Sequence, residues 1–374
     1  MSNVVFCSKC GSENKSTNNK CDECGEFLLK PELLKAKSEE KFDDLFTNKN
    51  KKALSQITID SYNTVINNII YMGRAHLDQI LQENNINVNE LSILNKIAIF
   101  TQAYVKVSYK TSGADLGHYS YNTIAVDDRL FESQQIATLI HELTHHIFSE
   151  IFEELLMYVW ECGKSDAIEA LAWFTVTGSP LISLTNEYCA HTVEGRFIPH
   201  GYQNYGSFNK ILSEEFNPEK DKEQVTLALY LGNTIAHDII YILEAFIGPG
   251  LREEIKQQFK QDSFPPRYDQ IIQEITDIMP DDLKIKIITD IMNSGYNAAQ
   301  EKDAHEILEN CKNSFTEANK GYESSSLISF DNSFKSLPCN PSTKYFHESS
   351  SEITLLNMNS SQAIANSFMT SSGL

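Results

Sequence analysis

His141-Glu142-Leu143-Thr144-His145 is the stretch of this chain that decides how the rest is interpreted. On a helix, residues four positions apart stand on the same face, so His141 and His145 can grip one metal ion. Glu142 lies beside them, placed to activate water at that metal. The pattern HExxH therefore predicts a zinc site on a helix and metal-assisted hydrolysis of a peptide bond.

The residues around this stretch have the spacing of a helix with one buried face. Ser133 is the expected N-cap, and the two histidines fall outside the apolar face. The apolar positions at helical spacing are Ile136, Leu139, Ile140, Leu143 and Ile147. The simpler alternative is an amphipathic helix whose histidines only face water.

Length and composition narrow the class of protein. The chain has 374 residues, 41% of them hydrophobic, which suffices for one large domain or two modest ones. A formal net charge of −20 makes a nucleic-acid surface an unlikely main activity. The N-terminal residues show no apolar signal segment, and the most apolar long stretch, 227–246, carries too many polar groups for a membrane span. We expect a cytoplasmic protein, with its oligomeric state open.

Four cysteines near the start predict a second metal site. Cys7, Cys10, Cys21 and Cys24 form two CxxC pairs separated by ten residues, which suits a closed tetrahedral zinc site. Residues 1–28 resemble the short zinc ribbons that begin many bacterial proteins, and such a ribbon would serve as a docking module. Two disulfides or a redox CxxC are the alternatives. The expected cofactors are two Zn²⁺, one catalytic and one structural.

The remaining sequence indicates an α+β fold that is mostly helical. A helix is expected from Ile57 to about Glu83, then strands at 103–109 and 119–126 that form a small hairpin or sheet before the HExxH helix. Further helices are expected at 148–162, 165–177 and 180–195, and across 207–320. The expected divisions are a zinc ribbon at 1–28, a charged linker at 29–56, the main domain at 57–320 and a Ser/Asn-rich tail at 321–374. The tail is expected to be disordered, unless its aromatic residues pack it against the domain.

The strand just before the HExxH helix is a candidate binding element. An edge strand beside a catalytic cleft can hold an extended peptide by backbone pairing. We expect this role for Tyr121–Val126, with substrate contacts from Tyr121, Asn122, Thr123 and Ile124. An ordinary core hairpin is the equal alternative.

A catalytic zinc ion needs a third protein ligand in addition to the two histidines. A third histidine ligand shortly after HExxH would lie at position 151, which holds Ile151. The segment 179–197 reads instead as a later helix, with Ser179 at its cap and Pro180 in its first turn. Glu187 is the expected ligand on this helix, and His191 lies four residues later on the same face. The alternative ligands are His191, Glu194, Glu150, Glu153 and Glu154, and replacing Glu194 is expected to spare the metal.

These features together resemble the gluzincin metallopeptidases. The resemblance implies that a glutamate one helix downstream, here Glu187, completes the zinc site with His141 and His145. In that family an acidic residue four positions later often orients a ligand histidine; this chain has His191 there, to which we assign that supporting role. HELTHHI, the preceding strand and Glu187-x-x-Ala190 also look loosely like peptidases of the ImmA/IrrE type, over about residues 120–197.

The predicted site also needs a proton donor to the transition state. Tyrosine or histidine commonly stabilises the oxyanion of peptide hydrolysis. His237 is our first choice, within a polar stripe along an otherwise apolar helix. That stripe would otherwise be an internal hydrogen-bond network. Further candidates are Tyr119, Tyr121, His200, Tyr202 and Tyr205.

The sequence thus predicts a zinc-dependent peptidase acting on a protein or peptide substrate. Glu142 would be the general base, with zinc on His141, His145 and Glu187. The alternative is a catalytically silent or regulatory zinc-binding protein that recruits partners through its ribbon and tail. An intact Glu142 argues against this alternative, because a metal scaffold has no need of a base there.

Overall fold

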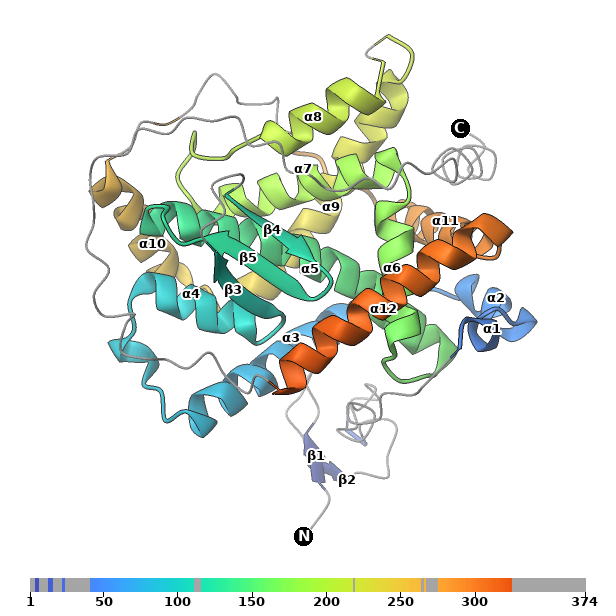
Figure 1. Cartoon of the computed structure of the whole chain (residues 1–374), viewed down its shortest axis with the longest axis horizontal. Coiled ribbons are helices and arrows are strands. Elements are labelled where there is room, and N and C mark those ends of the chain that lie inside the picture. The colour runs from blue at the N-terminus through green and yellow to red at the C-terminus, as the bar shows by residue number, and fades with distance from the viewer. Residues whose placement is uncertain are drawn as a thin grey trace.

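The computed structural model describes residues 4–6, 13–15, 22–23, 41–110, 116–217, 219–263, 266 and 275–324. This part of the chain is mostly helical and includes one small mixed sheet (Figure 1). The α+β, mainly helical class expected from the sequence is therefore correct. A single set of buried side chains, from Phe42 to Phe315, forms the core.

The helix that carries HExxH, α5 (Glu132–Trp160), is the centre of this core. It contacts α2 (Asn48–Leu54), α3 (Ile59–Glu83), α4 (Ile93–Gln102), α6 (Asp166–Thr177) and α7 (Pro180–Phe197). The expected HExxH helix after Ser133 and the expected helix at 148–162 are thus one continuous helix. It begins one residue before Ser133, after the N-cap Phe131, so Ser133 is not the cap. The Ser133 amide instead donates a hydrogen bond to Asp262 Oδ2 at 3.0 Å.

The sheet contains three strands in the order β3 (Lys106–Lys110), β5 (Thr123–Asp127), β4 (Gly117–Ser120). β3 pairs with β5 in parallel, with Lys106 opposite Thr123. β4 pairs with β5 in antiparallel fashion, with Ser120 opposite Thr123. The turn between them consists of Tyr121 and Asn122, at φ 40° and 56°, the left-handed pair that a two-residue hairpin turn needs. The predicted strand at 119–126 is therefore two strands and a turn.

The remaining helices surround α5 and α7 (Figure 1). α8 (Gly206–Glu215), α9 (Lys222–Glu244) and α10 (Pro249–Asp262) contact α7, and α10 also contacts α5. α11 (Asp281–Ala298) and α12 (Lys302–Ser324) pack on α6. Residues 245–248 separate α9 from α10, and Pro249 is the first residue of α10.

The expected linker at 29–56 includes a packed part. α1 (Phe42–Leu45) and α2 bury Phe42, Leu45 and Leu54 in the core. Trp160 Nε1 donates a hydrogen bond to the Asn50 carbonyl at 3.1 Å, which ties α2 to the end of α5. A few apolar residues among many lysines and aspartates are enough to dock residues 41–56, and residues 29–40 of the expected linker lie outside the described residues.

The expected zinc ribbon and tail lie largely outside the described residues. The two short strands β1 (Val4–Phe6) and β2 (Glu13–Lys15) pair in antiparallel fashion. Cys7, Cys10, Cys21 and Cys24 are outside the described residues, as is the tail from residue 325 onward. A short 3₁₀ turn, Val88–Glu90, connects α3 to α4.

Within the described part of the chain, α9 alone is long and apolar enough to cross a bilayer, and half of its apolar window is buried. The pair α6 and α7 would pass only as one span, although they bend by 92° at their junction. Composition of this kind is equally typical of a core helix. It is weak evidence for a membrane span.

Candidate metal centre

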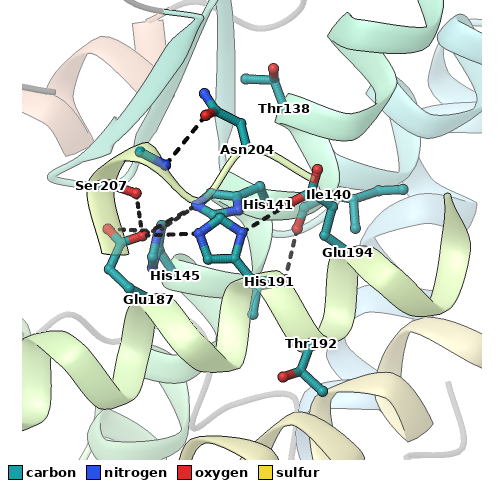
Figure 2. Close-up of polar contacts among 12 residues, drawn as sticks. Thr138, Ile140, His141, His145, Glu187, His191, Thr192, Glu194, Asn204 and Ser207 are labelled. Atoms are coloured by element: carbon teal, nitrogen blue, oxygen red, sulfur yellow. Dashed lines mark hydrogen bonds and ion pairs between the residues drawn. The ribbon is translucent and has the colours of Figure 1, made fainter. Parts of the chain in front are cut away.

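Two helices bring the predicted site together. His141 and His145 project from α5, and Glu187 projects from α7 toward them (Figure 2). The two Nε2 atoms lie 3.1 Å apart. The two Glu187 carboxylate oxygens face them: Oε2 lies 3.7 Å from His141 Nε2, and Oε1 lies 3.7 Å from His145 Nε2. Two nitrogens and one carboxylate thus converge, which is the donor set of a catalytic zinc site.

Each histidine of this pair is held through its other ring nitrogen. His145 Nδ1 lies 3.0 Å from Asn186 Oδ1, and His141 Nδ1 lies 3.3 Å from Glu194 Oε2. Because a carboxylate only accepts hydrogen bonds, the proton between His141 and Glu194 is assigned to Nδ1. In the neutral form that binds metal, the ring then directs its Nε2 lone pair toward the cluster. Outer partners of this kind orient metal-binding histidines and fix their tautomer.

Glu187 is fixed in its turn. Only 4% of the residue is exposed, and Ser207 Oγ, from the first turn of α8, donates a hydrogen bond to its Oε2 at 2.6 Å. Burial alone would raise the pKa of Glu187, but the imidazoles of His145 and His141 outweigh it, so the pKa is lowered. Glu187 is therefore a carboxylate at neutral pH, the form that binds metal.

Two further side chains of α7 belong to the same cluster. His191 Nδ1 lies 3.3 Å from Glu194 Oε2, and its Nε2 lies 3.9 Å from Glu187 Oε2. One donor atom each from His141, Glu187 and His191 falls within 4.8 Å of the others. The Tyr205 ring packs on the His191 ring at 4.3 Å between centroids. The donor chemistry of the whole cluster fits a divalent metal such as zinc.

The buried acids compensate the buried bases. Burial disfavours the charged form of His141, yet its hydrogen bonds to Glu187 and Glu194 raise the pKa well above the ordinary value. Burial would also raise the pKa of Glu194, but hydrogen bonds from His141 and His191 lower it. Such mutual dependence makes each member of the cluster costly to remove on its own.

Glu142, the predicted base, lies at the margin of the cluster. It is half-buried, while both of its neighbours in the cluster, Glu187 and Glu194, are buried. Burial raises its pKa, and the charges of His141 and His145 oppose the shift. The same carboxylate interacts with His118 of β4. Glu142 thus interacts with both the cluster and the sheet.

The predicted substrate contacts do not have the expected position. Tyr121–Val126 is no edge strand, because β5 is paired on both sides, with β3 and with β4. Tyr121 and Asn122 form the hairpin turn, and Thr123 and Ile124 lie in the central strand. Tyr121 packs on Trp173 of α6 and Phe315 of α12, and Asn122 Nδ2 donates a hydrogen bond to Glu169 Oε1 at 2.7 Å. Tyr121, Asn122 and Ile124 are thus engaged within the fold: the first two contact α6, and Ile124 is buried in the core.

The structure also places His237 away from the site. It is exposed on α9, and α9 packs against the face of α7 opposite Glu187. A Cβ at Gly232 of α9 would come 2.7 Å from the Thr185 carbonyl, which shows how closely the two helices approach on that face. Nearby members of the polar stripe are satisfied internally: Asn233 donates to the Asp277 carbonyl, and Thr234 accepts from the Met279 amide. The internal hydrogen-bond network therefore includes Asn233 and Thr234, whereas His237 of the same stripe is exposed.

The other glutamates weighed as ligands lie further along α5. Glu150 and Glu153 pair with Lys164, at 3.5 and 3.0 Å. His146 turns toward the same region: its Nδ1 is hydrogen-bonded to Tyr119 OH at 3.2 Å, and burial lowers its pKa to about 4. Among the described residues, Glu150, Glu153 and His146 make no hydrogen bond or ion pair with the cluster of His141, His145, Glu187, His191 and Glu194.

Several members of the site were not singled out from the sequence. Asn186 and Ser207 both contact the cluster directly, and Glu194 supports His141, a role assigned to His191. Asn186 precedes Glu187 in the chain, and that adjacency was the only available signal. Ser207 comes from another helix, and local spacing gives no indication of it.

No protein-family model, curated protein or solved structure matches this chain. The functional interpretation therefore rests on the geometry of the cluster.

Proposed function

We propose that this protein is a zinc-dependent peptidase. One observation carries the proposal: the Nε2 atoms of His141 and His145 converge with the Glu187 carboxylate, and Glu142 adjoins them. Zinc held by these residues would supply Lewis acidity, lowering the pKa of water and polarising a carbonyl group. Glu142 would accept a proton from the attacking water and pass it to the leaving amine.

The sheet supports an extended substrate, although through another strand than expected. Among the described residues β4 is paired on one side only, with β5. It also contacts α5, where a Cβ at Gly117 would meet the Thr138 side chain. His118 of β4 interacts with Glu142. A peptide that added to the outer edge of β4 would therefore pass near Glu142.

The test separates metal binding from chemistry. We would measure zinc content and cleavage of a quenched fluorescent peptide library by the wild-type chain, Glu142→Gln and the control Glu253→Gln. Glu253 is exposed on α10. Glu142→Gln should keep its zinc and lose activity by a factor on the order of a hundred or more, because the water loses its proton acceptor.

Undiminished cleavage by Glu142→Gln would remove Glu142 from the mechanism. A wild-type protein that binds zinc at the cluster but cleaves nothing in the library would favour the alternative, a regulatory zinc-binding protein.

A further inference from the structure

Glu194 holds two imidazoles in the same way. Its Oε2 lies 3.3 Å from His141 Nδ1 and 3.3 Å from His191 Nδ1 (Figure 2). The opposite nitrogens of both rings point to one acceptor: His141 Nε2 and His191 Nε2 lie 3.7 and 3.9 Å from Glu187 Oε2. His141 and His191 thus form a matched pair between Glu194 behind them and Glu187 in front.

The environment of His191 Nε2 is unusual for a buried nitrogen. Only 1% of the residue is exposed, and Nε2 has no hydrogen-bond partner among the described residues. With the Nδ1 proton directed at Glu194, Nε2 of the neutral ring carries a lone pair. A buried lone pair without a donor costs free energy, and its absence of a partner calls for an explanation.

We infer that His191 Nε2 is a fourth protein ligand of the metal, so that the centre contains three imidazoles and one carboxylate. This inference rests on the metal centre of the proposed function. The argument that makes His141 a ligand applies equally to His191, because the same oxygen of Glu194 orients both rings. Ligation by His191 also accounts for its unpartnered nitrogen.

A fourth protein ligand changes the coordination of the site. Three protein ligands leave zinc one open position in a tetrahedral site, whereas four fill the tetrahedron. Water can then bind only if the ion becomes five-coordinate, which catalytic zinc sites also adopt. If His191 were instead a supporting residue or a proton donor, the metal would have only the two nitrogen ligands His141 and His145. The coordination number of the metal therefore distinguishes these roles.

The test uses His191→Asn in the full-length chain. The shorter amide can still donate to Glu194 from near the Nδ1 position, but no atom remains at the Nε2 position. His237→Asn is the matched control, because His237 is exposed on the far side of α7. Zn²⁺ affinity is measured by competition with a chromophoric chelator, and Co²⁺ replaces zinc for visible absorption. Charge-transfer bands from thiolates report separately on any four-cysteine site.

We expect His191→Asn to weaken Zn²⁺ binding about a hundredfold. Loss of a residue that only hydrogen-bonds to a metal ligand typically weakens metal binding ten- to hundredfold, so the expected effect lies at or above the upper end of that range. The cobalt bands should change because the ion loses one nitrogen ligand. A five-coordinate wild-type centre would become four-coordinate, with stronger absorption, and a four-coordinate centre would exchange imidazole for water, which shifts the bands. His237→Asn should match the wild type in both. Cobalt bands that His191→Asn leaves unchanged would overturn the inference and leave the proposed peptidase site intact.

A second measurement does not depend on the folding of any variant. In an anomalous difference map of the zinc-loaded wild-type protein, His191 Nε2 should lie about 2.0–2.1 Å from the metal. A zinc ion bound by His141, His145 and Glu187 with His191 beyond about 3 Å would overturn the inference alone. No zinc at the cluster would overturn both the inference and the proposed function.

Discussion

Glu194→Ala is the perturbation that most directly tests how the site is built. The Glu194 carboxylate accepts hydrogen bonds from His141 Nδ1 and His191 Nδ1, at 3.3 Å each, and 4% of the residue is exposed. Helical spacing alone predicts that this substitution spares the metal. The contacts predict the opposite, because both rings lose the partner that fixes their tautomer and orientation.

The expected magnitude follows from the two contacts. A hydrogen bond to a charged group contributes about 1.5–3 kcal/mol, and solvent screening is slight at this burial. Since 1.4 kcal/mol is tenfold in affinity, losing the His141 contact alone should weaken zinc binding about ten- to hundredfold. Loss of both oriented rings would add to this. Glu194→Gln should lie between wild type and Glu194→Ala, because its amide oxygen can still accept a hydrogen bond.

The assay is a competitive zinc titration, with circular dichroism to confirm folding. Glu244→Ala is a suitable control, since Glu244 is a partly exposed glutamate that pairs with Arg196 at 2.6 Å on the surface. It should leave zinc affinity unchanged. If a folded Glu194→Ala variant bound zinc as tightly as the wild type, the claim that Glu194 orients the ligands would be refuted.

Three further outcomes are expected. Glu187→Ala should weaken zinc binding at the cluster, because the ion loses its one carboxylate ligand, and metal analysis should still find any zinc at the N-terminal cysteines. Removing residues 1–28 should lower the zinc content from about two per chain to about one; an unchanged count would argue against the four-cysteine site. Burial, then the charge of Glu150, raises the pKa of Glu154 to about 8 from 4.5, so its contribution is lost as pH rises from 4.5 to 8. Glu154→Gln should therefore become more stable than wild type as pH rises through that window. A pKa unit corresponds to about 1.4 kcal/mol, and after a discount for partial exposure and coupling the gain should be about 2 kcal/mol. Denaturant unfolding of both proteins at pH 5 and pH 8 measures it.

The helical parts of the site were predictable because their geometry is local. His141 and His145 are four residues apart, as are Glu187 and His191, and in each pair the helix alone places both side chains on one face. The starts of α6 and α7 also depend on local features: the Ser165 side chain caps α6, and Pro180 is the first residue of α7, after Ser179. Ligand roles remain proposals, but the positions of these residues did not require tertiary information.

The sheet was harder to predict because its pairing is not local. Tyr121 and Asn122 interrupt a run that reads as one strand, and the pair lacks the glycine that usually marks such a turn. Parallel pairing of β3 with β5 also skips the intervening β4, so adjacency in sequence gave the wrong partner. As a result, the free edge was assigned to the central strand.

The same lack of tertiary information explains why the sequence placed His237 at the site. Periodicity identifies the polar face of α9 but not which side of α7 the helix will cover. In the structure α9 packs behind α7, and Gly232 permits an approach in which a Cβ would meet the Thr185 carbonyl at 2.7 Å.

The opposite face of α7 carries Glu187, His191 and Glu194, so packing against α9 holds these side chains toward α5. All the described acidic groups of the cluster other than Glu142 come from this one helix. The spacing between the carboxylates and the histidines of α5 is therefore set by how α7 sits between α5 and α9. A core substitution along the α7–α9 interface, distant from any ligand, would move three members of the site at once.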